Sequence, residues 1–218
     1  MTVKPEALTP DVSQPEAADP FGLSAAELTP AVRAALALAR AEADELRAEL
    51  ARQQQRLEEV ELLADRDALT PVLNRRAFMR ELHRTIAYCE RYDAPATLVF
   101  FDMDGFKAVN DAFGHAAGDA ALQWVAATLA DHVRESDVVG RMGGDEFAVI
   151  LAQASRESGE AKAADLAQQV EASPVVHEGR EIPLRVSYGV RPFHKGVDAA
   201  GFLAEADAAM FVAKGARR

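Results

Sequence analysis

A long stretch near the N-terminus follows one unbroken helical repeat, and this feature constrains the fold more than any other. Residues 31–64 contain no Gly or Pro and are dominated by Ala, Leu, Glu, Arg and Gln, which are strong helix formers. Apolar residues recur there at alternating spacings of three and four, with one polar exception. These positions are Val32, Leu36, Ala39, Ala43, Leu46, Leu50, Gln53, Leu57, Val60 and Ala64. The pattern is the heptad repeat of a coiled coil.

The residues beside this apolar seam indicate how two copies would pair. In a parallel dimer, position g of one helix faces position e of the next heptad on the other helix. The facing pairs are Glu42 with Arg47, Glu49 with Gln54, and Arg56 with Glu61. Two pairs carry opposite charges and none carries like charges, so we expect a homodimer through 31–64. The alternative is a single amphipathic helix packed on its own domain.

The N-terminal segment and the overall composition exclude several classes of protein. Residues 1–30 hold half of the chain's ten prolines and show no sustained period, so we expect a disordered tail. A net charge of −11 argues against nucleic-acid or membrane partners. We find no signal peptide and no apolar run near the roughly 18 residues of a membrane span. Cys89 is the one cysteine, which fits a reducing cytoplasm.

From residue 65 onward, strand patterns alternate with helix patterns. Strands are predicted at 97–101, at 182–193, and on both sides of a Gly-Gly turn within 138–152. Helical spacing is found at 108–133, 159–172 and 199–214. Strands interleaved with helices indicate an α/β (α+β) domain over 65–218, in which helices cover a sheet.

Carboxylates stand at the ends of two predicted strands. Asp102 and Asp104 follow the strand at 97–101, and Asp145 and Glu146 follow the glycine pair of the hairpin. Carboxylates from two strands suit a divalent metal that carries a nucleotide triphosphate. The alternative is that these acidic residues merely form turns.

The segment between these carboxylates offers groups that could bind a nucleotide. It contains neither a P-loop nor a G-x-G-x-x-G fingerprint. Lys107 could neutralise a phosphate. The amide of Asn110 and the carboxylate of Asp119 could read a guanine, because that base offers N1–H and N2–H₂ donors to a carboxylate.

Four sequence blocks, in order, resemble the GGDEF domains, the family of the diguanylate cyclases. They are DALTPVLNRR at 67–76, FFDMDGFKAVNDAFGHAAGD at 100–119, RESDVVGRMGGDEF at 134–147 and ADAAMFVAK at 206–214. The resemblance covers about residues 65–218. It implies a palm-like, ferredoxin-like sheet covered by helices, the nucleotidyl cyclase fold. It also implies that two facing domains each bind GTP and form cyclic di-GMP, with release of two pyrophosphates.

The resemblance assigns roles to residues at matching positions. For Mg²⁺, or Mn²⁺, the implied ligands are Asp102, Asp145 and the carbonyl of Met103. The implied catalytic residues are Asp145, Glu146 and Lys107. The implied substrate-binding residues are Phe106, Lys107, Asn110, Asp119, Gly143, Gly144, Lys214 and Arg218.

The resemblance also implies an inhibitory product site. Arg134 and Asp137 form an R-x-x-D sequence five residues before Gly143, where this family binds its product. The planar guanidinium of Arg134 could grip phosphate or guanine, and Asp137 could accept from a guanine edge. The alternative is a solvated salt bridge at a helix end. The chain departs from the family at Pro71, where Gly is usual, and in its last residues.

These observations together predict a cytoplasmic, homodimeric diguanylate cyclase with product feedback. Its expected partners are GTP, cyclic di-GMP and a second copy of the chain. Two alternatives stay open: a catalytically inactive module that binds GTP or cyclic di-GMP, and an adaptor that recruits partners through 31–64.

Overall fold

The computed structural model describes residues 29–216, without the side chains of 55, 57–64 and 216. The predicted disordered tail lies outside the described residues except for its last two, and so does Arg218. Contacts divide the chain into two units, 1–59 and 60–218, and each is described by itself.

Helix α1 (Pro30–Asp65), most of which belongs to the first unit, covers the predicted helical stretch and extends it by one residue at each end. Pro30 suits the first helical position, and the Thr29 hydroxyl accepts a hydrogen bond from the Val32 N–H at 3.3 Å. Within this single chain the side chains of Leu46 and Leu50 are 64% and 59% exposed. The pairing of two such helices stays a prediction.

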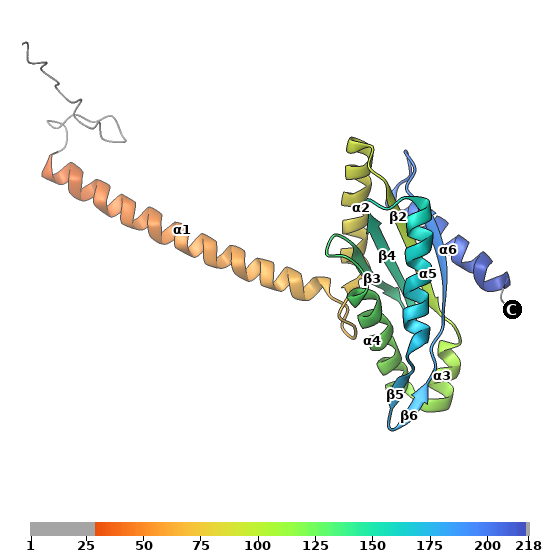
Figure 1. Cartoon of the computed structure of the whole chain (residues 1–218). Helices are drawn as coiled ribbons and strands as arrows, with labels where there is room; N and C mark the ends of the chain where they lie inside the picture. Colours follow the sequence, from red (N-terminus) through yellow and green to blue (C-terminus); the bar gives the residue numbers. More distant parts are fainter. Residues whose placement is uncertain (1–28, 217–218) are drawn as a thin grey trace, which may run out of the picture. The chain divides into compact units, whose positions relative to one another are not determined.

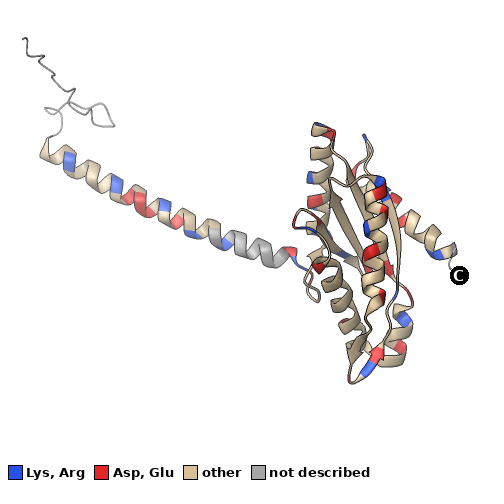
Figure 2. Cartoon of the chain, in the orientation of Figure 1, with Lys and Arg blue, Asp and Glu red and all other residues tan. Residues whose placement is uncertain are grey.

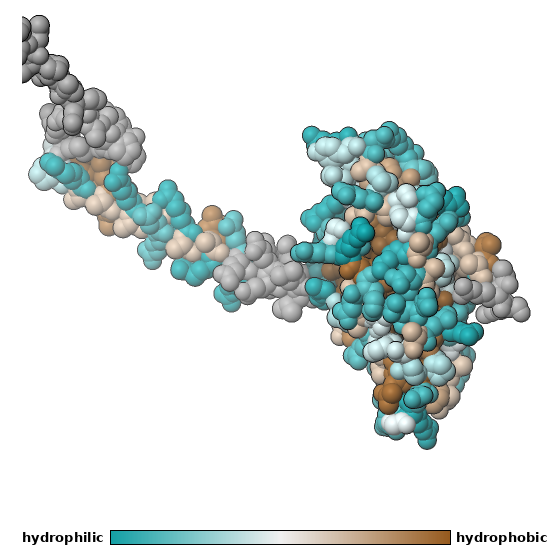
Figure 3. Space-filling view, viewed as in Figure 1, coloured by the Kyte–Doolittle hydropathy of each residue, from teal (hydrophilic) through white to brown (hydrophobic). Residues whose placement is uncertain are grey.

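The surface of α1 mixes charges of both signs with exposed apolar residues (Figures 2 and 3). Arg47 pairs with Asp44 at 2.8 Å, and Arg52 pairs with Glu49 at 2.7 Å. These pairs join residues one turn apart in the same helix and add little stability at an exposed site.

The second unit is built on a five-stranded sheet in the order β1-β3-β4-β2-β7. Figure 1 labels three of these strands, β2, β3 and β4. Its strands are β1 (Leu73–Asn74), β2 (Ala96–Met103), β3 (Val138–Gly143), β4 (Glu146–Ala152) and β7 (Val186–Pro192). All neighbouring strands are antiparallel except β1 and β3. A separate hairpin joins β5 (Val175–His177) to β6 (Arg180–Ile182).

Five helices accompany these strands. They are α2 (Arg75–Tyr92), α3 (Phe106–Phe113), α4 (His115–Asp131), α5 (Arg156–Ala172) and α6 (Ala199–Ala216). The order β2, α3–α4, β3, β4, α5, β7 is the β-α-β-β-α-β unit of ferredoxin-like folds, with β2 between β4 and β7 in the sheet. The expected sheet covered by helices is therefore confirmed.

Alternate residues of β2 face two different helix layers. Phe101 packs with α4 and α5 on one face of the sheet, whereas Leu98 and Phe100 pack with α2 and α6 on the other. Because strand side chains alternate between faces, this central strand is buried on both sides and reads as a continuous apolar run. Among the described helices, none is long and apolar enough to cross a bilayer.

Two predicted elements are wrong in detail. The single helix expected over 108–133 is two helices, α3 and α4, because Gly114 between them adopts φ 85 and ψ 165. The strand expected over 182–193 is divided: Ile182 ends β6, and β7 begins at Val186, after a break that starts at Pro183, which lacks the N–H that a ladder needs.

Helix α2 was not expected from the sequence. It begins after Asn74, whose side-chain oxygen accepts a hydrogen bond from the Ala77 N–H at 3.0 Å. Its buried residues are Ala77, Phe78, Leu82, Ile86 and Cys89, at the spacing of one helical face. The sequence carried this signal, so the helix was predictable.

Helix α6 packs directly against the backbone of β7 at Gly189. A Cβ atom at this position would lie 2.1 Å from the Met210 nitrogen and 2.3 Å from the Ala206 oxygen. Only glycine allows that approach. The contact fixes the height of α6 along the sheet.

Candidate active site

The sheet brings carboxylates from two neighbouring strands together. Asp102 on β2 lies directly opposite Glu146 on β4. Asp102 therefore lies within β2, which ends at Met103, and not beyond the strand as expected. The Met103 N–H donates a hydrogen bond to the Asp145 carbonyl at 3.2 Å. Asp102, Met103, Asp145 and Glu146 thus form one cluster.

The carboxylates of this cluster repel one another. Burial raises the pKa of Asp145, and the nearby charge of Asp102 raises it further. Burial also raises the pKa of Glu146, followed by the charges of Asp207, Asp102 and Asp145. Such a cluster favours a bound cation, because a positive charge would relieve the repulsion.

The donor set of this cluster fits a hard divalent cation. It consists of oxygen atoms, which Mg²⁺ prefers. Over residues 29–216, no group of three or more His, Cys, Asp and Glu side chains is arranged to hold a metal alone. A metal held by Asp102 and Asp145 would therefore need oxygens from a nucleotide or from water, as Mg²⁺ sites commonly use.

Lys214, in the last turn of α6, reaches the same cluster. Its Nζ forms an ion pair with Asp102 and lies 3.8 Å from the Asp104 carboxylate. The buried Ser187 hydroxyl on β7 holds Asp104 by a 2.8 Å hydrogen bond. The structure therefore places Asp104 beside Asp102 and adds Ser187 to the residues expected here.

The hairpin between β3 and β4 presents Asp145 at its tip. The register shifts by one residue between Arg141 and Gly143, which places a bulge at Met142. Gly143 and Gly144 adopt φ 147 and φ 53, which other residues rarely adopt. The two glycines therefore permit a turn that aims Asp145 toward the end of β2.

The expected nucleotide-binding residues gather where α3 meets α4. A Cβ atom at Gly118 would lie 2.0 Å from the Asn110 side-chain oxygen and 3.3 Å from the Phe106 ring. Both side chains therefore lie against Gly118, beside the exposed Asp119. Lys107 is exposed in the first turn of α3.

Arg134 and Asp137 lie before β3, at the end opposite to the Gly-Gly turn. The Asp137 carboxylate accepts hydrogen bonds from the Arg134 N–H and the Ala152 N–H, both at 3.0 Å. Among the described residues, no ion pair joins the two side chains, so the alternative of a simple Arg–Asp salt bridge is not observed. The Arg134 residue is exposed.

Two surface pockets share Arg134 and Asp137. The larger, of about 670 Å³, is also lined by His132, Lys162 and Asp165. The smaller, of about 410 Å³, is also lined by Arg66 and Glu81. The R-x-x-D residues thus stand between two hollows that contain basic side chains.

Some residues near the carboxylate cluster were not singled out from the sequence. Asp207 raises the pKa of Glu146 and lies seven residues before Lys214 on α6. Seven residues are about two turns, so the predicted helix already placed both on one face. Asp67 and Arg141 form an ion pair across 74 positions of sequence, which no local pattern reveals.

The fold and the cluster define a ferredoxin-like α+β domain. Its acidic site lies at the tip of a Gly-Gly hairpin and favours a bound cation. The family model described as "Diguanylate cyclase, GGDEF domain" matches residues 64–218. The chain belongs to this GGDEF-domain family.

Named relatives show how far the similarity extends. Probable diguanylate cyclase DgcC of Escherichia coli is 36% identical over 169 residues, which cover 73% of this chain and 43% of that protein. Diguanylate cyclase TpbB of Pseudomonas aeruginosa is 34% identical over 173 residues, covering 78% and 40%. The chain thus spans less than half the length of these relatives.

A solved structure matches most of the chain. The coiled coil and GGDEF domain of DgcB from Caulobacter crescentus, in complex with c-di-GMP, is 27% identical with a TM-score of 0.73. The match covers 82% of this chain and 95% of that one.

Proposed function

We propose that this chain is a diguanylate cyclase that condenses two GTP molecules into cyclic di-GMP and two pyrophosphates. The observation that carries the proposal is the cluster of Asp102, Asp145 and Glu146, in which two carboxylates have raised pKa values. Membership of the GGDEF family gives this acidic cluster its chemical context.

The cluster would hold Mg²⁺, or Mn²⁺, through Asp102, Asp145 and the Met103 carbonyl. When bound, such an ion stabilises the charge of the reacting phosphates and activates the attacking 3′-hydroxyl. Glu146 supports the metal site or the proton transfer from that hydroxyl. Lys214 pairs with Asp102, and its ammonium group would contact a phosphate of the bound nucleotide.

The remaining substrate contacts come from α3, α4 and the hairpin. Lys107 and the N-terminal N–H groups of α3 favour an anionic phosphate. The backbone at Gly143 and Gly144 can approach phosphate closely because no side chain intervenes. Asn110, Asp119 and Phe106 would bind the guanine, since Asn110 and Phe106 lie together beside Asp119.

One domain binds one GTP, so the reaction needs two domains that face each other. The heptad seam of α1 supports a homodimer that supplies this arrangement, because Leu46 and Leu50 are exposed in the single chain. The related DgcB structure also contains a coiled coil with a GGDEF domain.

Arg134 and Asp137 would bind the product and limit its synthesis. Support comes from the exposed Arg134, from the pockets on both sides of it, and from c-di-GMP in the DgcB complex. The cytoplasm is the proposed location, because Cys89 is the chain's one cysteine and a disulfide within the chain is impossible.

The deciding experiment incubates the purified chain with GTP and Mg²⁺ and identifies products by mass spectrometry. Cyclic di-GMP formation from GTP, but not from ATP, is the expected result. Binding of GTP without turnover would instead favour the inactive module, and neither binding nor turnover would favour the adaptor. Equal turnover of ATP would contradict guanine recognition by Asn110 and Asp119.

A second experiment tests the half-site arrangement. Replacing Leu46 and Leu50 with Glu places like charges in the seam. Specific activity should fall at low protein concentration and recover partly as concentration rises. Activity that is independent of concentration, from a monomer verified by sedimentation, would contradict the dimer.

A further inference from the structure

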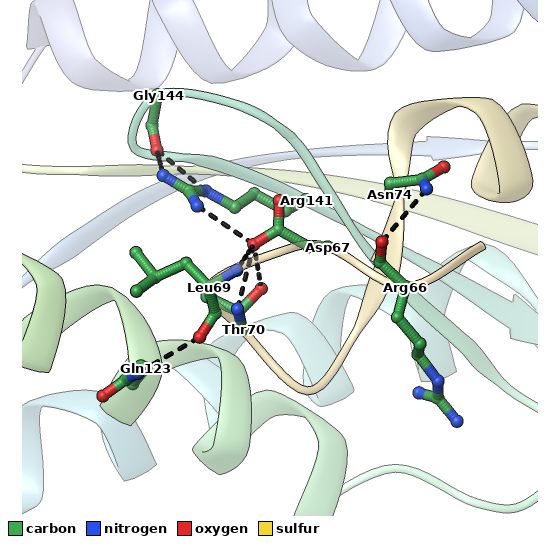
Figure 4. Close-up of polar contacts among 8 residues, drawn as sticks. All are labelled: Arg66, Asp67, Leu69, Thr70, Asn74, Gln123, Arg141 and Gly144. Atoms are coloured by element: carbon green, nitrogen blue, oxygen red, sulfur yellow. Dashed lines mark hydrogen bonds and ion pairs between the residues drawn. The ribbon is translucent and has the colours of Figure 1, made fainter. Parts of the chain in front are cut away.

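Arg141 uses both sides of its guanidinium to join two distant parts of the domain (Figure 4). Its Nε and Nη2 donate to the Gly144 carbonyl at 3.0 and 2.6 Å. Its Nη1 donates to the Asp67 carboxylate at 3.0 Å. The Arg141 side chain is only 14% exposed, so solvent competes weakly for these hydrogen bonds.

Asp67 is a fixed anchor for this contact. Its Oδ1 also accepts hydrogen bonds from the N–H groups of Leu69 and Thr70 and from the Thr70 hydroxyl. Burial alone would raise the pKa of Asp67, but the hydrogen bonds from Thr70 and Arg141 outweigh burial and lower it. Gln123 of α4 donates to the Leu69 carbonyl at 3.2 Å and ties this loop to the domain.

The Gly144 and Asp145 carbonyls lie on either side of the Asp145 Cα atom. Arg141 binds the first, and the Met103 N–H binds the second at 3.2 Å. Because each peptide is planar, holding both carbonyls fixes the two backbone dihedrals of Asp145. The backbone then fixes the direction of the Cα–Cβ bond and restricts the rotamers that the side chain can adopt.

The hairpin needs such a restraint. Gly143 and Gly144 precede Asp145 directly, and glycine has more backbone freedom than any other residue. Without the Arg141 contact, the contacts described for this turn would be the Met103 hydrogen bond, a long 3.4 Å hydrogen bond from Arg75 to the Met142 carbonyl, and the β3–β4 ladder.

We propose that Arg141, anchored by Asp67, is a positioning residue that sets the direction of the Asp145 carboxylate toward Asp102. This inference rests on the proposed function of Asp145 as a metal ligand. In this role the side chain acts through its hydrogen bonds to the Gly144 carbonyl and not as a metal ligand.

Arginine suits this position better than lysine. A guanidinium offers donors in a planar fork and can bind Gly144 and Asp67 at once, whereas an ammonium is a point charge on a flexible stem. Arg141→Lys therefore keeps the positive charge but cannot bind the Gly144 carbonyl and the Asp67 carboxylate at the same time with the same geometry. Arg80→Lys is a matched control, because Arg80 likewise pairs with a carboxylate, that of Asp65.

The test measures metal binding separately from turnover. Mn²⁺ binding to the full chain is followed by electron paramagnetic resonance, with a non-hydrolysable GTP analogue present. Arg141→Lys should weaken Mn²⁺ binding and lower kcat, each by about ten- to hundredfold, as is typical when a support of a metal ligand is lost. The KM for GTP and the thermal midpoint should change little, and Arg80→Lys should match the wild type in every measurement.

A double-mutant cycle tests the anchor. If Arg141 acts through Asp67, then Asp67→Asn should also weaken Mn²⁺ binding. The double variant should lose less than the product of the two single losses. Multiplicative losses would overturn the role of Asp67.

The remaining outcomes are equally decisive. Wild-type Mn²⁺ affinity in Arg141→Lys would overturn the inference. A lower thermal midpoint together with an unchanged Mn²⁺ affinity would overturn it as well, because Arg141 would then only stabilise the fold. If Arg141→Lys fails to fold, Asp67→Asn and hydrogen exchange of the hairpin amides decide the question: unchanged exchange contradicts it. If the wild type binds Mn²⁺ but makes no cyclic di-GMP, the proposed function fails while the Mn²⁺ comparison still tests Arg141.

Discussion

The two ends of β3 carry aspartates in opposite electrostatic situations. At one end, Asp145 follows the Gly-Gly turn, and burial together with the charge of Asp102 raises its pKa. At the other end, Asp137 precedes the strand, and both of its carboxylate oxygens accept backbone N–H groups. An aspartate carboxylate is thus destabilised by charge repulsion at one end of β3, and an aspartate carboxylate is stabilised by hydrogen bonds at the other end.

The difference separates Asp145, the carboxylate proposed to bind a metal, from Asp137, whose carboxylate also supports the fold. A repelled carboxylate destabilises the domain until a cation arrives, whereas Asp137 ties the start of β3 to Ala152 at the end of β4. A sequence motif does not distinguish these cases. Variants at each end should therefore differ in stability as well as in activity.

The largest expected effect is at Asp145. Asp145→Asn should abolish turnover, because it removes the charge of a proposed metal ligand. It should also raise the thermal midpoint, because it relieves repulsion with Asp102 and Glu146; relief of each kcal/mol is worth about 2–4 °C in a domain of this size. Turnover assays and calorimetry on one preparation check both. An inactive variant that is also less stable would contradict the comparison.

The next effect is on product inhibition. Arg134→Ala removes the guanidinium proposed to grip cyclic di-GMP, at a cost of about 1.5–3 kcal/mol for a charged hydrogen bond. The inhibition constant should rise roughly ten- to hundredfold, since 1.4 kcal/mol is tenfold. Progress curves with added product measure it. An unchanged constant would place the inhibitory site elsewhere, and a collapse of the initial velocity would place Arg134 in the active site.

A smaller effect separates Arg134 from Asp137. Asp137→Ala leaves two backbone N–H groups without their partner, which should lower the free energy of unfolding by about 1–3 kcal/mol. Arg134→Ala keeps its backbone N–H and the Asp137 carboxylate, so it should cost less than about 0.5 kcal/mol, as for surface substitutions. Urea denaturation of both variants is the measurement. Equal losses would show that Asp137 has no special structural role.

The smallest effect is in the dependence of stability on pH. Asp145 has a raised pKa, so its destabilising contribution is absent below the unfolded value of about 3.9 and appears as pH rises through the folded value. The stability advantage of Asp145→Asn should therefore vanish near pH 3. Asp67 has a lowered pKa, so its stabilising contribution is lost as pH falls through the folded value. Thermal midpoints are measured from pH 3 to 7. As pH rises, the midpoint of Asp145→Asn should move above that of the wild type, and the midpoint of Asp67→Asn should move below it. Both differences should vanish in acid.

Local patterns predicted most of the sheet and the core of the site. The apolar run of β2 and the glycine pair between β3 and β4 marked the strands that bring Asp102 and Asp145 together. The break at Gly114 was missed because the helical spacing of apolar residues in α4 continues into α3. Gly114 lets the chain turn between the two helices without interrupting that spacing. Helix α2 was missed although its apolar face is regular.

Residues that act across long separations in sequence could not be found in this way. The contact of Arg141 with Asp67 depends on how β3 lies beside the loop before α2, and the contact of Lys214 with Asp102 spans 112 positions. The hydrogen bonds of Asp137 also depend on the pairing of β3 with β4. Only the assembled sheet reveals that its carboxylate is already occupied.

The contact at Gly189 has a consequence for how this domain can evolve. Lys214 lies four residues, or about one helical turn, beyond Met210, whose backbone rests on Gly189. The reach of the lysine is therefore set by a residue that carries no functional group. Any larger side chain at position 189 would push α6 away from the sheet and move the Lys214 ammonium group away from the carboxylates. Selection on activity consequently extends to a buried position in the sheet, where a single methyl group is too large.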